Sequence, residues 1–277
     1  MGQKGSMIVR AAFATLERIA PAAGARWAER LWFTLPRRRP VRPIPGGTTF
    51  AVSFDGHNVV GQTWGDGPTI YLVHGWAGDR THFAAFLSPL VEAGYRVVAF
   101  DAPSHGESGP GVYGPRSSTV PEFVAAFQAV VARYGMPHAI VAHSVGAAAV
   151  AVALCDGQRA TRVVLISPIA GVPAFERTLA ATLGYGERTR RRLVARAERR
   201  VGAPMRHFDV PELGRAVLMP KTLIVHDRDD TMTPVAEAEA IAAAWVDSRL
   251  LVTSRLGHRR LLRDPTVIAE VVDFVTN

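Results

Sequence analysis

Cysteine is almost absent from this sequence, and long hydrophobic runs are absent altogether. Cys155 is the only cysteine among 277 residues, so neither an internal disulfide nor a metal site built from cysteines can form. No apolar run approaches the roughly 18 residues that a membrane-spanning helix needs. Arg10, Glu17 and Arg18 interrupt the N-terminal region before the apolar core of a secretory signal could form. We therefore expect a soluble, cytoplasmic protein.

Lysine is equally scarce. It occurs only at Lys4 and Lys221, so arginine supplies nearly all of the positive charge behind the formal net charge of +8. An arginine cluster between residues 188 and 200 is typical of a solvated helix face, and no aromatic residues are interleaved as in single-strand nucleic-acid binders. We expect no nucleic-acid partner, and attraction of anionic or lipid-like substrates is the alternative interpretation of the cluster.

The N-terminal region predicts a helical arm. Apolar side chains recur between residues 8 and 33 at a spacing typical of one or two amphipathic helices, with a break near Pro21 and Gly24. A connector rich in proline and arginine follows. We therefore assign residues 1–47 to an arm and connector that packs on the domain without touching a membrane, and residues 48–277 to one α/β domain.

Short apolar runs alternate with helical stretches through this domain. The predicted strands cover residues 48–54, 58–64, 69–74, 95–100, 139–143, 162–167, 222–226 and 249–253. The predicted helices cover about 81–93, 119–134, 145–156, 234–246 and 264–275. This alternation predicts an α/β fold with a doubly wound, mostly parallel eight-stranded sheet and a ligand site at the carboxyl ends of its strands. The interval of about 169–220 has two helical patterns and no strand, and it predicts a small helical cap.

Ser144 lies where the predicted strand 139–143 meets an alanine-rich helix. A serine on such a sharp turn is forced towards positive φ, so the residues two places away on each side must be small, as Ala142 and Gly146 are. The turn leaves the backbone N–H of Val145 at a helix N-terminus, where it can bind a developing oxyanion. This pattern is a nucleophile elbow, and its alternative is a serine that simply caps a helix.

Further polar motifs follow other predicted strands: His74-Gly75-Trp76, a loop from Asp227 to Pro234, and Leu256-Gly257-His258. The order of nucleophile, acid and histidine resembles the alpha/beta hydrolase family from about Thr48 to the C-terminus. The resemblance implies that fold, and it implies a catalytic serine at Ser144, a general base at His258 and an oxyanion hole formed by the N–H groups of Trp76 and Val145.

The acid of this set has more than one candidate. The family usually places it three residues after a glycine, and Asp227 occupies the glycine position here. Counting three residues onward favours Asp230, which would hold the imidazole in the right tautomer. Asp229 remains the alternative, and Asp227 is a third choice because its strand is ending there.

Other histidines also lie near strand ends, namely His74, His105, His143 and His226. They are not spaced like metal ligands, and we expect them to hydrogen-bond the loops around the site. Asp101 is expected to hold its own turn together. The sequence has no phosphate-binding lysine motif, so we predict neither a metal nor a cofactor.

These residues together predict a serine hydrolase that cleaves a carboxylic ester or related acyl bond of a small molecule through an acyl-enzyme. Thioesterase, amidase, C–C hydrolase and perhydrolase activities use the same residues and stay open. The alternative from another class is a ligand-binding protein on the hydrolase fold with little turnover. The oligomeric state is not predicted.

Overall fold

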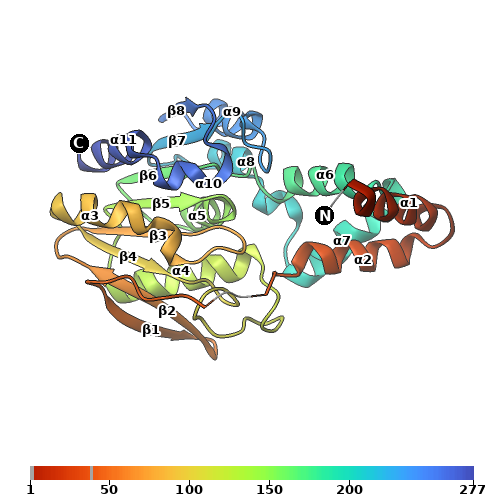
Figure 1. The fold of residues 1–277 in the computed structure, drawn as a ribbon, viewed down its shortest axis with the longest axis horizontal. Helices are drawn as coiled ribbons and strands as arrows, with labels where there is room; N and C mark the ends of the chain where they lie inside the picture. Colours follow the sequence, from red (N-terminus) through yellow and green to blue (C-terminus); the bar gives the residue numbers. More distant parts are fainter. Residues whose placement is uncertain (1–2, 38–39) are drawn as a thin grey trace.

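An eight-stranded sheet forms the centre of the computed structural model, which describes residues 3–37 and 40–277 (Figure 1). The strands are β1 (Thr48–Phe54), β2 (His57–Trp64), β3 (Thr69–Val73), β4 (Arg96–Phe100), β5 (Ala139–His143), β6 (Arg162–Ile166), β7 (Lys221–Asp227) and β8 (Ser248–Thr253). Their order is β1-β2-β4-β3-β5-β6-β7-β8. Pairing is antiparallel for β1–β2 and β2–β4 and parallel elsewhere. The predicted doubly wound, mostly parallel sheet is confirmed.

Helices cover both faces of the sheet. One face carries α4 (Val120–Tyr134), α5 (Val145–Cys155), α8 (Val210–Ala216) and α9 (Val235–Ala244), and the other carries α3 (Ala84–Glu92) and α11 (Pro265–Thr276). The central strands are apolar at all but their terminal positions because both of their faces are buried. In β3, for example, Tyr71 and Val73 pack against the first group of helices, whereas Ile70 and Leu72 pack against the second.

The strand order places the carboxyl end of β3 beside that of β5. β3 pairs with β4 on one side and with β5 on the other, so the direction of winding changes there. In open α/β sheets, ligands bind in the crevice at such a switch point. The loops after β3 and β5 carry the His74-Gly75-Trp76 sequence and Ser144, and they therefore meet at this edge.

The N-terminal arm and the insertion after β6 form a separate helical layer. It contains α1 (Gln3–Ile19), α2 (Pro21–Phe33), α6 (Val172–Leu183) and α7 (Glu187–Val201), which lie together beyond one edge of the sheet (Figure 1). The break between the arm helices falls at Ala20, which confirms the predicted break near Pro21, whereas Gly24 lies inside α2 and does not interrupt it. We expected the arm to pack on the domain, and it does so through α6 and α7 of the insertion.

This layer has its own apolar core. Phe13 is fully buried, stacks on Trp27 with 4.5 Å between ring centroids, and contacts Tyr185 at 5.8 Å. Trp32 and Phe33 at the end of α2 belong to the same core. The later part of the insertion returns to the sheet, where α8 packs on α5 and α9. The predicted cap interval therefore contains one sheet-covering helix in addition to α6 and α7.

Acidic residues of the arm hold the start and the middle of α7. The Glu17 carboxylate accepts hydrogen bonds from the backbone N–H groups of Gly186, Arg188 and Thr189, where the helix dipole favours negative charge. Glu29 pairs with Arg196 and lies 3.8 Å from Arg200. Part of the arginine cluster therefore joins arm to insertion, which neither sequence interpretation anticipated.

Two further observations concern the burial of Cys155 and the length of the helices. Cys155 is half-buried at the end of α5. Within the part of the chain that the structure describes, we find no helix with the length and apolar character needed to cross a bilayer.

The packing of Phe13 predicts a large difference between two substitutions in α1. Phe13→Ala should lower the free energy of unfolding by about 3–5 kcal/mol, because it leaves a cavity in the apolar core of the helical layer. Ile19→Ala, at a position that is 75% exposed, should change it by less than about 0.5 kcal/mol. Denaturant titration and limited proteolysis of the arm measure the two effects. Equal losses for both variants would contradict the described packing.

Candidate active site

Ser144 sits on a tight turn between β5 and α5. Its φ is 56° and its ψ is −121°, a backbone conformation that residues other than glycine rarely adopt. A Cβ atom on Gly146 would lie 2.6 Å from the carbonyl oxygens of both Val73 and His74, so a larger residue would push the two loops apart. Gly75 approaches as closely, since a Cβ there would lie 2.8 Å from Ser144 Cβ. The two glycines let the loops after β3 and β5 touch.

His258 and Asp230 form a buried pair on the neighbouring loops. Nδ1 of His258 lies 2.7 Å from Oδ2 of Asp230, and the two side chains are 7% and 0% exposed. Burial alone would raise the pKa of Asp230, but hydrogen bonds from His258, Thr233 and Met232 outweigh it and hold this pKa below its ordinary value. An ionised carboxylate facing Nδ1 keeps the proton on that nitrogen and leaves Nε2 free to accept another.

The two rival aspartates contact other groups. Asp229 is exposed, and its Oδ2 accepts a hydrogen bond from the backbone N–H of Arg255 at 2.7 Å. Asp227 is fully buried at the end of β7. In the part of the chain that the structure describes, Asp230 pairs with His258, whereas neither Asp229 nor Asp227 forms a hydrogen bond or ion pair with the imidazole.

Asp227 ties the loop after β7 to the loop that carries His258. Its carboxylate accepts hydrogen bonds from the Thr253 hydroxyl at 2.7 Å and from the N–H groups of Gly257 at 2.9 Å, Asp229 at 3.0 Å and Leu256 at 3.1 Å. Burial raises the pKa of Asp227, yet these donors more than compensate and lower it overall. The departure from the family's usual glycine thus gives the site a buried connection between β7 and β8.

Two of the flanking histidines hydrogen-bond the loops that carry His258 and Asp230. His143 donates from Nε2 to the His258 carbonyl oxygen at 3.0 Å, and the two rings lie 4.8 Å apart. Burial, together with the nearby His258, lowers the pKa of His143 to about 3, so this ring is neutral. His226 is fully buried, and its Nε2 donates to the Thr233 carbonyl oxygen at 2.9 Å. Both histidines bond loops around the site, as expected.

The other two histidines brace the loop after β3. His74 Nε2 accepts from the Ala102 N–H at 2.9 Å, and burial lowers its pKa. His105 Nε2 accepts from the Ala77 N–H at 3.2 Å. Each contact links the segment 74–77 to the loop after β4, which fixes the position of the Trp76 N–H.

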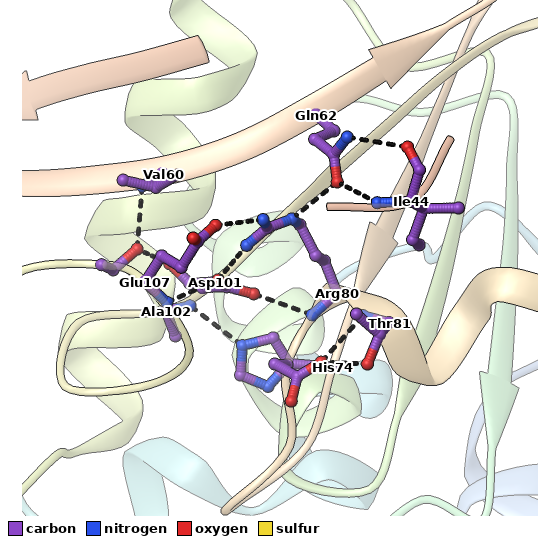
Figure 2. Close-up of polar contacts among 11 residues, drawn as sticks. Ile44, Val60, Gln62, His74, Arg80, Thr81, Asp101, Ala102 and Glu107 are labelled. Carbon is purple, nitrogen blue, oxygen red and sulfur yellow. Dashed lines mark hydrogen bonds and ion pairs between the residues drawn. The ribbon is translucent and has the colours of Figure 1, made fainter. Parts of the chain in front are cut away.

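A buried ion pair, which we did not predict from the sequence, also anchors this region. Arg80 and Asp101 are both 0% exposed and pair directly, while Asp101 also accepts from the Arg80 backbone N–H at 2.8 Å (Figure 2). The guanidinium further pairs with Glu107 and donates to Gln62 Oε1 at 3.1 Å. Asp101 thus holds more than its own turn, since it joins the loop after β4 to the short 3-10 helix Arg80–Phe83 that precedes α3.

The predicted oxyanion donors lie on the two loops that the glycines bring together. Val145 begins α5, and Trp76 lies in the turn after β3. Within residues 3–37 and 40–277, no protein group accepts a hydrogen bond from either backbone N–H. Free donors of this kind are what an oxyanion hole requires.

Ser144, His258, Trp76 and Val145 line one cavity of about 260 Å³. Its outer wall is largely apolar and comes from the helical layer, with Trp32 and Phe33 from α2 and Val172, Phe175, Ala197 and Val201 from the insertion. Sequence reasoning missed the arm's part in this wall, because an amphipathic pattern does not say what its apolar face contacts. It also missed Ser118, a fully buried cavity residue whose Oγ has no partner among the described residues.

Comparisons with known proteins agree with this architecture. A family model described as the alpha/beta hydrolase family matches residues 70–271. A non-heme haloperoxidase from Rhodococcus erythropolis aligns over a length of 274 residues at 27% identity. The alignment covers 82% of this chain and 98% of that protein. The structure of an esterase from Rhodococcus sp. ECU1013 superposes with a TM-score of 0.63 at 19% identity, covering 84% of this chain and 99% of the other, and shows the shared fold.

One further relative matches over a shorter region. The dihydrolipoyllysine-residue acetyltransferase component of an acetoin cleaving system from Cupriavidus necator is 36% identical over 107 residues, or 38% of this chain. The matched region spans only 28% of that protein's length.

The hydrogen bonds of Asp227 predict a pH-dependent contribution to stability. Because its pKa is lower in the folded chain than in the unfolded one, the contribution is present above the ordinary value of about 4 and is lost as pH falls through the folded-state value. Asp227→Asn should therefore lower the free energy of unfolding by about 1–3 kcal/mol at pH 7, with the deficit shrinking below about pH 4. Denaturant titrations across this range provide the measurement. Asp66→Asn, on an exposed turn, is the control, and a deficit for Asp227→Asn that persisted unchanged at pH 3 would contradict this account.

Proposed function

The chain belongs to the alpha/beta hydrolase family, and we propose that it is a serine hydrolase that cleaves a carboxylic ester or a related acyl bond. The observation that carries the proposal is the buried contact between His258 Nδ1 and Asp230, at the wall of the cavity that Ser144 also lines. Cytoplasmic localisation, expected from the sequence, is part of the same proposal.

In the first half of the reaction, the Ser144 hydroxyl attacks the substrate carbonyl and its proton passes to Nε2 of His258. The imidazolium that forms is stabilised by the Asp230 carboxylate. The carbonyl oxygen becomes an oxyanion that accepts hydrogen bonds from the N–H groups of Val145 and Trp76. Collapse of this intermediate breaks the bond to the leaving group, which takes the proton from His258 and departs as an alcohol.

The second half repeats these steps with water. His258 removes a proton from water, and the resulting hydroxide attacks the acyl carbon of the Ser144 ester. The same two N–H groups bind the second oxyanion. When the intermediate collapses, the proton returns from His258 to the Ser144 oxygen, and the free carboxylic acid leaves.

The apolar wall of the cavity is suited to bind an acyl or alkyl group of moderate size. Its apolar residues stabilise a hydrocarbon portion by removing it from water, at about 25 cal/mol per Å² of apolar surface. The buried hydroxyl of Ser118 supplies a hydrogen-bonding position for one polar substrate atom, because an unpartnered buried hydroxyl is unfavourable. Thioesters, amides and C–C bonds next to a carbonyl fit the same scheme.

The similarity to the non-heme haloperoxidase favours one second candidate, which is perhydrolysis. Hydrogen peroxide would then replace water as the nucleophile that attacks the acyl-enzyme, so that the product is a peracid. Both reactions use Ser144, His258 and Asp230. Product analysis with and without peroxide separates them, since one yields the acid and the other the peracid.

The role of Ser144 predicts covalent labelling. A fluorophosphonate probe should label the protein rapidly, and Ser144→Ala should abolish both labelling and ester turnover, because the reacting oxygen is gone. Ser53→Ala is the matched control, since it removes the hydroxyl of an exposed serine on β1 that does not line the cavity. Circular dichroism checks that both variants fold. Absence of labelling in the wild-type protein between pH 6 and 9 would instead favour the ligand-binding alternative.

The position of Asp230 predicts an asymmetry between two neighbouring acids. Asp230→Asn should reduce kcat by a factor on the order of 10⁴, because an amide no longer favours the tautomer with a proton on His258 Nδ1. Asp229→Asn should reduce it less than about tenfold, since this carboxylate contacts only loop backbone. Steady-state kinetics on one p-nitrophenyl ester compares them. Comparable losses, or the reverse order, would remove Asp230 from the proposed role.

A further inference from the structure

A second cleft lies behind the catalytic cavity, between α2, the loop before α4 and α7. Its volume is about 500 Å³. The charged residues that line it are Arg26, Arg30, Arg116, Arg196, Arg200 and Glu29. We refer to it as the arginine cleft. Five guanidinium groups therefore face one carboxylate.

The single carboxylate leaves most of this positive charge uncompensated. Glu29 is already bound by Arg196 and lies near Arg200. Across residues 3–37 and 40–277, no carboxylate forms an ion pair with Arg26, Arg30 or Arg116. Among the described residues, the guanidinium of Arg116 donates only to the Leu35 carbonyl oxygen, at 3.3 Å. Like charges gathered in one concave site repel one another and attract an anion.

One of the cleft arginines is held rigidly. The Arg200 guanidinium lies between two rings, 4.1 Å from the centre of Tyr113 and 4.7 Å from that of Phe33. Its Nη2 donates to Ser117 Oγ at 2.8 Å, and Tyr113 donates its hydroxyl to the Arg200 carbonyl oxygen. Nε of Arg200 is buried and has no partner among the described residues. The loop before α4 and helix α2 of the arm therefore both contact this side chain of α7.

The arginine cleft shares a wall with the catalytic cavity. Phe33 lines both. Ser117 lines the cleft, and the next residue, Ser118, lines the cavity with its unpartnered hydroxyl. An apolar cavity that contains the proposed nucleophile therefore adjoins a strongly cationic cleft.

We propose that the arginine cleft binds a phosphate group, and that this group belongs to a ligand whose apolar part occupies the adjacent cavity. The planar guanidinium fork matches the oxygens of a phosphate, and several such forks suit a dianion better than a single carboxylate. The cleft volume falls in the usual range for small-molecule sites. The second half of the proposal rests on the proposed function and names its substrate class, which is an acyl compound with a phosphate-bearing alcohol or thiol portion.

The first experiment measures phosphate binding without any turnover. Isothermal titration of the full-length protein with pyrophosphate, at physiological ionic strength, should give saturable binding. Arg26→Ala/Arg30→Ala should weaken it at least about tenfold, because two charge-assisted contacts are lost. Both side chains are exposed and form no ion pair with described residues, so the double variant should remain folded.

The matched control is Arg191→Ala/Arg192→Ala. These exposed arginines lie on α7 outside the cleft, and their removal changes the net charge by the same amount. This variant should bind pyrophosphate as the wild type does. No binding to the wild type, or equal weakening in both double variants, would overturn the phosphate site, whatever the fate of the proposed hydrolase activity.

The second experiment tests the connection to the cavity. Hexyl phosphate should slow fluorophosphonate labelling of Ser144 in the wild type, with at least about tenfold less protection in Arg26→Ala/Arg30→Ala than in the control. Pyrophosphate binding without such protection would overturn the link between cleft and cavity. A protein that binds pyrophosphate but is not labelled at all would overturn the proposed function and leave the phosphate site standing.

A phosphate group can come from a soluble ester or from a lipid headgroup. Flotation of the protein with phosphatidic acid vesicles separates the two sources. Vesicle binding that depends on Arg26 and Arg30, and that pyrophosphate displaces, supports a lipid source. Pyrophosphate binding without flotation supports a soluble phosphate ester.

Discussion

The backbone turn at Ser144 is the constraint on which the rest of the site depends. Its positive φ carries strain of about 1–3 kcal/mol, which only a well-packed surrounding structure can sustain. The buried strand β5 and the apolar helix α5 supply that packing on either side. Gly146 and Gly75 then allow the loop after β3 to touch the turn, so that the N–H groups of Trp76 and Val145 belong to the same small volume.

Buried polar side chains form many of the hydrogen bonds that hold the loops around this turn. Asp227 gathers donors from three neighbouring segments, and His143 holds the backbone of His258 through a neutral ring. Arg80 and Asp101 perform a similar task for the loop after β3. Buried charges of this kind are costly when a partner is missing, at about 3–5 kcal/mol, and so they favour a single loop arrangement. Reactive side chains held this way need little reorganisation when charge develops near them.

Much of this arrangement was predictable because its signals are local. Strands buried on both faces appear as short apolar runs, and the residues that follow them meet at one edge whatever the details of packing. Counting along the loop after Asp227 pointed to Asp230, and the structure places that residue beside His258. The predicted catalytic roles go beyond geometry and await the experiments that address them.

The arm and the ion pairs could not be predicted in the same way, because they depend on contacts between distant segments. Glu29 and Arg196 are 167 positions apart, and nothing near either residue identifies the other. Arg80 looks like an ordinary surface arginine until the fold encloses it. The short helix Val210–Ala216 lies in the strandless interval yet packs on the sheet, since its apolar residues face α5 and α9.

The apolar core of the helical layer limits how such a chain can be re-engineered or can diverge. Its two halves, from the arm and from the insertion, are discontinuous along the chain but interdigitate in space. A chimera that transplanted only the insertion from another hydrolase would leave Phe13 and Trp32 without their native neighbours. The arm and the insertion therefore form one wall of the cavity together, and we expect recombination to preserve that wall only where both segments are transferred.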